Sequence, residues 1–465
     1  MPSTLSRWRA ANLPSMIRKL ISRVLRLPSR SRQHDNRARV IPFVQHGVRR
    51  DQVSPSALKV TSRLQEAGFE AYVVGGAVRD LLIGHEPKDF DVATNATPEE
   101  VHRLFRRSRI IGRRFRIVHV VFGRDEVIEV TTFRGDGRDL QTTESGRIIS
   151  DNSYGSMADD SRRRDFTANA LYYNPADESI HDYHHGVRDV TARRLVMIGQ
   201  PIERYKEDPV RMLRAVRLAA KLGFSIDEST RKPISHLAPL LRDVAQARLF
   251  DEMLKMLHSG ASWACLTRLR AEGLHKGIFP LLDAVLDQPD GSSFVKLALD
   301  QTDQRLKNGR GISDGFLLAA LLWGEVRTEW QRRQDTGEKP LPALFDAMDV
   351  VEAKLVDRLA IPRRFLITMR EIWSMQPRYE NRSGSRPFKL LEQPRFRAGY
   401  DFLCLRASVG EVPQELAHWW EKFQYADSEA RNGMLVRETR EGPAKKRRRR
   451  RRKTPGTDAS GGNEA

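Results

Sequence analysis

Hydrophobic and polar residues follow a mixed pattern over residues 54–189 of the chain. "SPSALKVTSRLQEAG" predicts a helix with a serine cap and a terminal glycine. "EAYVVGG" predicts a strand that ends in a turn, and "AVRDLLIG" predicts the short helix after it. "DFDVAT", "IVHVVF" and "VIEVTTF" predict three further strands, and a helix opened by Thr97 and Pro98 follows the first of them. This region is therefore expected to form a small α/β head.

After Asp189 the strand signals fade and long helical patterns follow: "DPVRMLRAVRLAAKLGF", "RLFDEMLKMLHSG", "FLLAALLWGEV", "VVEAKLVDRLA" and "PRFRAGYDFLCLRASVG". No repeat of fixed period is visible. The expected fold class is α+β, with the small head on a mostly helical neck and body and flexible basic ends. We expect an arm at 1–50, the head at 51–190, a neck at 191–260, an RNA-binding body at 261–430 and a tail at 431–465.

The net charge of +20 is concentrated at the two ends of the chain. Residues 1–50 contribute +11 and the run "KKRRRRRRK" contributes +9, whereas residues 51–444 contribute only +2. Basic arms of this kind attract polyanions through counterion release and long-range steering. Consecutive bases cannot pack into a core, so the run is predicted to be disordered as well as RNA-binding. Its members are Lys445, Lys446, Arg447, Arg448, Arg449, Arg450, Arg451, Arg452 and Lys453.

The basic segment "SMIRKLISRVLRL" has apolar residues at helical spacing. Such a pattern is typical of a helix on an anionic membrane surface or on RNA, and it also fits an unstructured arm. Cys265 and Cys404 lie outside any CxxC pattern, so a reducing, cytoplasmic setting without zinc or disulfides is expected. No apolar run approaches the roughly 20 residues that span a bilayer.

Candidate chemistry begins in "VVGGAVRDLLIGHEPKDFDVAT". Asp89 and Asp91 are two apart on a predicted strand, so both carboxylates are expected on one face, where hard oxygen ligands suit Mg²⁺. Gly75 and Gly76 lie where a strand turns into a helix, and backbone N–H groups there can face phosphates. Arg79, one turn later, can reach a phosphate or brace the head. Together these features predict a metal and triphosphate site.

Two further acids are candidates for the same site. Glu129 is predicted on a strand beside the one carrying the two aspartates, where it could bind metal or take a proton from an attacking hydroxyl. Asp165 lies in "RRRDFTANALYY", just before a helix expected to open at Thr167. Its structural alternative is to cap that helix or to pair with Arg163 or Arg164.

These segments resemble, in order and spacing, the motif series of the class II nucleotidyltransferases, which are the bacterial poly(A) polymerases and the tRNA CCA-adding enzymes. The resemblance rests on "VVGGAVRDLLIGHEPKDFDVATNATPEEV", "VIEVTTFRG", "RRRDFTANALYY" and "YKEDPVRMLRAVRLAAKLGF", and it covers roughly residues 55–260. It implies template-independent nucleotidyl transfer, in which an RNA 3′-hydroxyl attacks the α-phosphate of ATP as substrate. It also implies two Mg²⁺ ions per site, with Mn²⁺ as an alternative.

The resemblance also assigns roles to particular residues. Asp89 and Asp91 would hold the metals. Asp165 would be a further catalytic residue, whereas strand geometry favours Glu129, so both stay candidates. Asp208 and Arg211 in "EDPVR" match the pair that recognises the base. Asp208 is expected to cap a helix started by Pro209, with an Asp208–Arg211 salt bridge as the structural alternative. The other nucleotide-binding candidates are Gly75, Gly76, Arg79, Arg134 and Arg164.

The branch of the family is indicated by "IIGRRFRIVHVVF" at residues 110–122, by "RLFDEMLKML", "LAIPRRF" and "FRAGYDFLCLRA", and by the basic tail. All of these resemble poly(A) polymerases. We therefore expect an RNA 3′-adenylating enzyme, acting as a monomer on mRNA and small-RNA ends and promoting RNA turnover with RNA-decay machinery. The alternatives are a tRNA CCA-adding enzyme and a non-catalytic RNA-binding protein.

Two other motifs are open to a chemical interpretation. "HDYHHG", from His181 to Gly186, resembles part of a metal phosphohydrolase site, but no further ligands follow at helical spacing, so metal binding is not expected. The pair Trp419–Trp420 could stack on RNA bases, yet packing of the last helix is the favoured interpretation.

Overall fold

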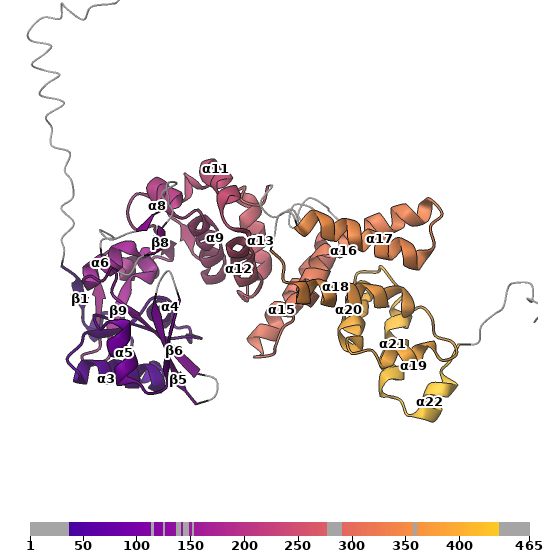
Figure 1. Ribbon diagram of the computed structural model, residues 1–465, viewed down its shortest axis with the longest axis horizontal. Coiled ribbons are helices and arrows are strands. Elements are labelled where there is room, and N and C mark those ends of the chain that lie inside the picture. Colours follow the sequence, from indigo (N-terminus) through magenta and orange to yellow (C-terminus); the bar gives the residue numbers. More distant parts are fainter. Residues whose placement is uncertain are drawn as a thin grey trace, which may run out of the picture. The chain divides into compact units, whose positions relative to one another are not determined.

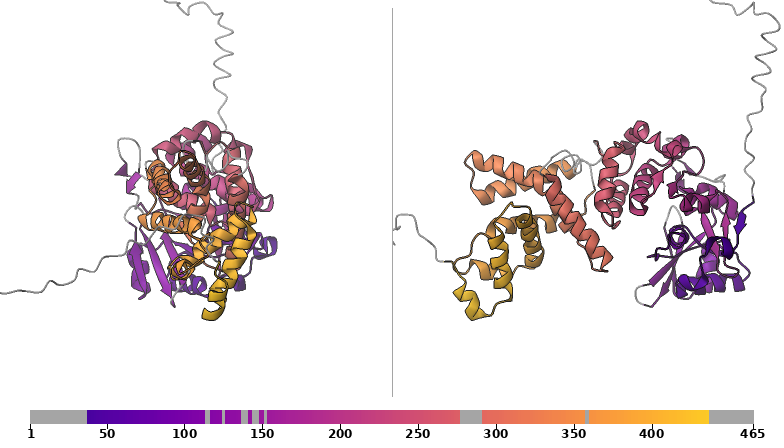
Figure 2. Two further views of the ribbon diagram at one scale, coloured as in Figure 1. Left: turned by 90° about the vertical axis from the view of Figure 1, so that its right-hand side faces the viewer. Right: turned by 180° about the vertical axis from the view of Figure 1, so that it is seen from behind.

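A computed structural model of the chain describes residues 37–112, 116–123, 126–135, 141–142, 148–150, 153–276, 291–356 and 360–436. The amphipathic segment of the arm and the basic run at 445–453 lie outside these ranges, and so do the predictions made for them. The chain divides into two compact units (Figures 1 and 2). The first holds Met1–Ser292, Leu299–Ile312 and Lys354–Ile361, and the second holds Ser293–Ala298, Ser313–Ala353 and Pro362–Ala465.

An eight-stranded sheet forms the centre of the head in the first unit. Its order is β1 (Arg39–Ile41), β10 (Ser179–Asp182), β9 (Leu171–Asn174), β2 (Ala71–Val74), β3 (Asp91–Thr94), β6 (Glu126–Thr132), β5 (Ile117–Phe122) and β4 (Ser108–Ile111). Every neighbouring pair is antiparallel except β3 and β6, which are parallel. A separate pair joins β7 (Gln141–Thr142) to β8 (Ile148–Ser150). The strands predicted from "EAYVVGG", "DFDVAT", "IVHVVF" and "VIEVTTF" are therefore confirmed as β2, β3, β5 and β6.

Helices α3 (Pro55–Glu66) and α5 (Pro98–Leu104) pack on the sheet from β2 to β4. Each begins where the sequence predicts, because the side chains of Ser54 and Thr97 accept backbone N–H bonds from their first turns. Helix α4 (Gly76–Leu82) follows β2 directly. The head is completed by short helices: α2 (Phe43–His46), η1 (Arg50–Gln52), α6 (Met157–Arg163), η2 (Thr167–Asn169) and α7 (Gly186–Thr191).

Two local predictions for the head are wrong. Asp89 precedes β3 instead of lying on it, because the partner strand β2 ends at Val74, opposite Asp91. Beyond Val74 the partner chain turns into α4, so residues before Asp91 have no strand to pair with on that side. The helix expected at Thr167 is only a three-residue 3₁₀ turn. The chain after it forms β9, since pairing with β10 and β2 outweighs local helix propensity.

The neck consists of short and medium helices after the head. These are α8 (Pro201–Glu207), α9 (Val210–Leu222), α10 (Glu228–Arg231), α11 (Ile234–Leu237), η3 (Ala238–Asp243), α12 (Gln246–Leu257) and α13 (Ser262–Ala271), with a parallel pair of β11 (Arg194–Leu195) and β12 (Ser225–Ile226). Helix α9 packs on α12 and α13 through its apolar side. It ends at Gly223, which adopts the left-handed conformation that glycine tolerates best.

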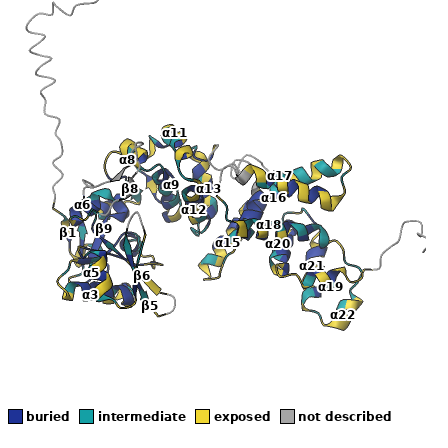
Figure 3. Ribbon diagram, in the orientation of Figure 1, coloured by how far each residue is buried: buried dark blue, intermediate teal, exposed yellow. Residues whose placement is uncertain are grey.

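The second unit is helical. It contains α16 (Asp314–Asp335), α18 (Arg363–Met375), η4 (Gln376–Arg378), α19 (Arg386–Leu391), α20 (Phe396–Ser408), α21 (Gln414–Tyr425) and α22 (Ser428–Gly433). Residues of α15 (Gly291–Lys307) and of α17 (Pro340–Val356) are divided between the two units. The first half of α16 is buried (Figure 3). None of the helices in the described ranges is long and apolar enough to cross a membrane.

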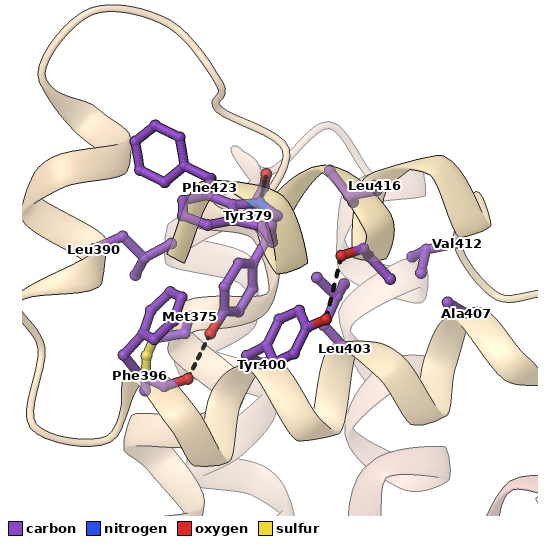
Figure 4. Close-up of a cluster of buried hydrophobic side chains, with 12 residues drawn as sticks. Met375, Tyr379, Leu390, Phe396, Tyr400, Leu403, Ala407, Val412, Leu416 and Phe423 are labelled. Carbon is purple, nitrogen blue, oxygen red and sulfur yellow. Dashed lines mark hydrogen bonds between the residues drawn. The ribbon is translucent and has the colours of Figure 1, made fainter. Parts of the chain in front are cut away.

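An aromatic cluster closes the C-terminal end of the second unit (Figure 4). Tyr379 donates a hydrogen bond from its hydroxyl to the carbonyl of Phe396 at 3.0 Å, which satisfies a polar group inside the core. Trp420 is fully buried there, and Trp419 packs beside it. The predicted packing role of the tryptophan pair is confirmed, although one more short helix, α22, follows α21.

Candidate active site

A cavity of about 500 Å³ opens beside the β2–α4 turn and is walled by the head and by α9 and α12. Seven basic and five acidic side chains line it, so it combines attraction for a polyanion with carboxylates that can face a cation. Sequence-predicted residues in this wall are Gly75, Gly76, Arg79, Asp91, Arg164, Asp165, Asp208 and Arg211. The fold therefore gathers residues from four separate motifs around one space.

A smaller cavity of about 200 Å³ adjoins the first over the sheet. Glu129 and Arg134 line only this smaller cavity, whereas Asp91, Arg163 and Arg164 line both. Asp89 is exposed and lines neither. Asp91 thus lies at the junction of the two spaces, with Glu129 on one side.

Asp91 and Glu129 occupy directly opposed positions of the parallel strands β3 and β6. The expected placement of Glu129 beside the strand of Asp91 is therefore confirmed. Burial, followed by the like charge of Glu129 and more weakly of Asp89, raises the pKa of Asp91 to about 6, against the opposing effect of Arg164. The carboxylates of Asp89, Asp91 and Glu129 are thus close enough to repel one another electrostatically beside the smaller cavity.

This donor set fits a hard divalent cation. Carboxylate oxygens are the ligands that Mg²⁺ prefers, and a cation would offset the mutual repulsion that raises the pKa of Asp91. Within the described ranges, no three Asp, Glu, His or Cys side chains converge in the manner of a closed metal cage. A cation held here would therefore take its remaining ligands from water and from nucleotide phosphates, as Mg²⁺ commonly does.

The glycine pair shapes the floor of the larger cavity. Gly75 has a φ of +79°, which most other residues adopt only with strain. A Cβ at Gly75 would lie 3.5 Å from Nη1 of Arg164, and one at Gly76 would lie 3.3 Å from Nη2 of Arg79. Glycine therefore keeps the backbone and both guanidinium groups open to the cavity.

Two arginines of the wall are held by buried polar networks. Arg164 donates from Nε to Asp160 at 3.1 Å and to the hydroxyl of Tyr172 at 3.0 Å, and that hydroxyl donates to Asp160 at 2.6 Å. Arg79 donates to Asp80 at 2.7 Å and to Asn169 at 2.6 Å. Because these partners fix the planes of both guanidinium groups, the cations are positioned before any ligand arrives.

Asp165 has a structural environment that the sequence did not predict. It accepts from Arg214 at 2.8 and 2.5 Å, from Nδ2 of Asn169 at 3.0 Å and from the backbone N–H of Phe166 at 2.8 Å. The expected alternatives of pairing with Arg163 or Arg164 and of capping a helix are therefore wrong. Although burial opposes its charge, the guanidinium of Arg214 and these hydrogen bonds lower the pKa of Asp165 to about 2.

The structural alternative for Asp208 and Arg211, a salt bridge between the two side chains, is not what the structure shows. The predicted capping role of Asp208 is confirmed, because its Oδ1 accepts from the backbone N–H of Val210 at 3.3 Å at the start of α9. Its two carboxylate oxygens also accept from Nη2 of Arg248 at 3.0 and 2.9 Å. Arg211 donates to Glu207 at 2.8 Å and to the carbonyl of Arg204 at 2.7 Å. Both members of the pair still line the larger cavity, each held by a different partner.

Sequence reasoning missed Arg214 and Arg248, although one signal for Arg214 was available. Arg211, Arg214 and Arg217 recur every three residues, which places them along one side of α9. Each pairs with a different acid, at Glu207, Asp165 and Glu252 respectively. The regular spacing of arginines after the "EDP" motif therefore indicated that one side of α9 is charged. No feature of the sequence near Arg248 indicated that it belongs to the site.

The "HDYHHG" segment has a structural role in the head. Asp182 at the end of β10 accepts backbone N–H bonds from His184 at 3.0 Å, Gly186 at 2.9 Å and Val187 at 3.0 Å. These bonds tie the turn to the start of α7.

A mixed sheet with opposed carboxylates on adjoining parallel strands, a glycine turn and a basic cavity defines a nucleotidyltransferase head. Family models agree along the chain: the poly A polymerase head domain matches residues 71–196, the "probable RNA and SrmB-binding site of polymerase A" matches 223–286, and the polymerase A arginine-rich C-terminus matches 336–454. The chain belongs to the bacterial poly(A) polymerase I family.

Individual relatives support the same assignment. Poly(A) polymerase I of Salmonella typhimurium is 44% identical over 85% of this chain and 88% of its own length, and that of Haemophilus influenzae is 41% identical over 88% and 93%. Among solved structures, the CCA-adding enzyme of Bacillus stearothermophilus, in complex with CTP, matches at a TM-score of 0.55 and 26% identity, over 80% of this chain and 82% of that one. The chain is a polynucleotide adenylyltransferase, and the predicted choice of this branch over the CCA-adding branch is confirmed.

Proposed function

We propose that an RNA 3′-hydroxyl placed in the smaller cavity attacks the α-phosphate of ATP bound in the larger one. AMP is thereby joined to the RNA, the hydroxyl proton is lost and pyrophosphate leaves. The assignment of ATP to one cavity and RNA to the other rests on the position of Asp91. Asp91 lines both cavities, whereas Glu129, which is opposite Asp91 in the sheet, lines only the smaller one. The reacting phosphorus would then lie beside Asp91. The basic wall supports placing the triphosphate in the larger cavity.

Asp89 and Asp91 are the proposed ligands of two Mg²⁺ ions. When bound, such ions neutralise phosphate charge and favour ionisation of the attacking hydroxyl. The exposure of Asp89 is compatible with this role, since a residue in the segment before β3 can approach a cation together with the nucleotide. Glu129 is the proposed acceptor of the hydroxyl proton, because its carboxylate is half exposed to the smaller cavity.

The arginines are proposed to position and neutralise the triphosphate. Arg164 and Arg79 are fixed by buried partners, so they need little reorganisation when phosphate oxygens approach. Asp165 is proposed to position Arg214 and hence α9, because one of its oxygens accepts two hydrogen bonds from the Arg214 guanidinium and the other accepts from Asn169 and the backbone of Phe166. Its low pKa makes it a poor proton acceptor during the reaction.

Nucleotide addition tests the function directly. Purified enzyme with Mg²⁺ is given an unstructured RNA or a tRNA lacking its last three nucleotides, together with one nucleotide triphosphate at a time. Long extension with ATP alone is expected on the unstructured RNA. Extension of the tRNA that uses CTP and stops after three additions would contradict the proposal in favour of CCA addition, and no addition would indicate a non-catalytic RNA-binding protein.

Asp208 and Arg211 are proposed to read the adenine base, with Arg248 fixing Asp208. Replacing Arg248 with alanine is expected to reduce the preference for ATP over CTP about tenfold, because an unanchored carboxylate can turn towards either base. The measurement is kcat/KM for each nucleotide. Arg242→Ala is the matched control, since Arg242 is exposed on the same neck and does not line the cavity. An unchanged ratio in Arg248→Ala would exclude this role.

The basic run at 445–453 is proposed to hold RNA by charge alone. Deleting these nine residues is expected to weaken RNA affinity and to flatten its dependence on salt, since fewer counterions are released on binding. Binding measured at several salt concentrations reports both quantities. An unchanged salt slope would show that the run does not contact RNA.

Residues 223–286 match a model described as a probable binding site for RNA and for a protein partner. We propose that this part of the neck, like the basic run, contacts RNA and helper proteins of RNA turnover.

A further inference from the structure

A row of directly opposed residues leads from the active site to the edge strand of the sheet. Asp91 on β3 is opposite Glu129 on β6, Glu129 is opposite His119 on β5, and His119 is opposite Arg109 on β4. Directly opposed residues project from the same face of a sheet, so these four side chains form one row. Three strand spacings of about 4.8 Å make the row roughly 14 Å long. It runs from the carboxylates to the edge strand.

The sheet face that carries this row retains apolar surface. Along β5 and β6, alternate residues are buried on the side covered by α3 and α5: Val118, Val120, Ile128 and Val130. The residues of the opposite face are only partly buried or exposed: Ile117, His119, Val121, Val127, Glu129 and Thr131. Val127 on that face is 41% exposed. We name this face the β4–β6 strip, made of Arg109, Ile111, Ile117, His119, Val121 and Val127.

The strip differs from an ordinary solvated sheet face. One face of an antiparallel sheet can meet water, and polar residues then normally occupy it. Here four of the six residues are β-branched and aliphatic: Val127 is exposed, and Ile111, Ile117 and Val121 are partly buried. Apolar surface grouped in this way beside a reactive site is a candidate binding surface.

The positive charge along the edge of the strip indicates which kind of molecule it binds. The stretch 101–112 holds four arginines and no acid, and all four arginines are exposed: Arg103, Arg106, Arg107 and Arg109. In the described part of the chain, Arg109 makes no side-chain hydrogen bond or ion pair that would occupy its guanidinium group. A basic edge beside an apolar surface, continuous with the carboxylates at which an RNA 3′-hydroxyl must react, suits the backbone and sugars of single-stranded RNA.

We propose that the β4–β6 strip binds the terminal nucleotides of the RNA and leads the 3′-hydroxyl to Glu129. This inference rests on the proposed function, and it adds a site for the acceptor strand in the head itself. Arg109 contacts a backbone phosphate, and the aliphatic residues contact sugars and bases. His119 is a positioning residue, because its Nε2 lies 3.3 Å from Oε1 of Glu129 and its place in the row is between Glu129 and Arg109.

Steady-state kinetics with a short unstructured RNA test the strip. Arg109→Glu is expected to raise the KM for RNA about tenfold and to leave the KM for ATP unchanged, because only the acceptor strand meets this residue. Arg63→Glu is the matched control: Arg63 is exposed on α3, which packs on the other face of the sheet. It should change both KM values less than about twofold. Equal RNA KM values in the two variants would overturn the proposal.

Crosslinking gives a second, independent readout. An RNA carrying a photoreactive 3′-terminal base is expected to crosslink to peptides within 108–122 in the wild-type enzyme and less in Arg109→Glu. Crosslinks confined to the neck or the second unit would exclude the strip. Failure of the wild-type enzyme to extend any RNA would instead reject the proposed function, whereas normal extension with an unchanged RNA KM in Arg109→Glu rejects the strip alone. Both variants should unfold at the wild-type temperature, since both positions are exposed.

Discussion

Asp91→Asn is expected to slow AMP addition by about 10³-fold or more while the enzyme stays folded and still binds RNA. The reason is positional: Asp91 lines the cavity proposed for ATP and the one proposed for the RNA end. Asparagine keeps the shape of the side chain but removes the charge that would face the cation and the phosphorus. Single-turnover extension of a labelled RNA measures the loss.

The fold should tolerate this change well. Asp91 is a partly buried carboxylate opposite another carboxylate, Glu129, and burial and this like charge outweigh the attraction of Arg164. Its neutral replacement therefore removes more unfavourable than favourable interaction. The variant is therefore expected to unfold at the wild-type temperature or above it. Asp243→Asn makes the same chemical change at an exposed position of the neck that lines neither cavity, and it should extend RNA normally. Extension by Asp91→Asn within tenfold of wild type would refute the metal site.

Much of the head could be predicted because its signals are local. Runs rich in β-branched residues predict β5 and β6, and the caps Ser54 and Thr97 mark where α3 and α5 begin. The neighbouring placement of Glu129 and the strand of Asp91 also followed from strand logic, and the parallel register of β3 and β6 bears it out. The position of Asp89 did not follow, because the end of β3 depends on where β2 stops, which is a property of the pair and not of either segment.

The charge partners of the site could not be predicted for a related reason. Arg214 is 49 residues from Asp165 and Arg248 is 40 residues from Asp208. Hydrophobic periodicity shows which side of α9 or α12 faces a core, but the opposite sides hold three arginines in α9 and both Arg248 and Lys255 in α12. Which of them meets which acid depends on how the helices pack against the head, and that packing is absent from any short stretch of sequence.

Glu129 and Asp165 are the two candidates for the third essential carboxylate. Stability and activity measurements on a variant of each residue distinguish between them. Asp165→Asn is expected to lower the free energy of unfolding by about 2–3 kcal/mol, because it breaks a buried, hydrogen-bonded ion pair with Arg214. Glu129→Gln should lose most of its activity with almost no change in stability, since that side chain is 48% exposed. Urea unfolding and single-turnover extension of both variants provide the comparison.

The pH dependence of stability follows from the lowered pKa of Asp165. Its ordinary value is about 3.9, and the folded state lowers it to about 2, so the ionised form is stabilised by folding. This contribution is fully present above about pH 4 and is lost as the pH falls towards 2. The difference in unfolding free energy between wild type and Asp165→Asn should therefore shrink between pH 5 and pH 2. A constant difference over that range would mean that the ionised Asp165 carboxylate, paired with Arg214, is not the source of the lost stability.

A double-mutant cycle separates positioning from direct catalysis. If Asp165 acts through Arg214, then Asp165→Asn and Arg214→Gln remove the same interaction, and the double variant should lose little more stability or activity than either single one. Additive losses in the rate of AMP addition would mean that Asp165 touches the reacting groups as well. The three protein donors that already occupy its oxygens argue for the first result, since a carboxylate so engaged has little capacity left for a metal or a proton.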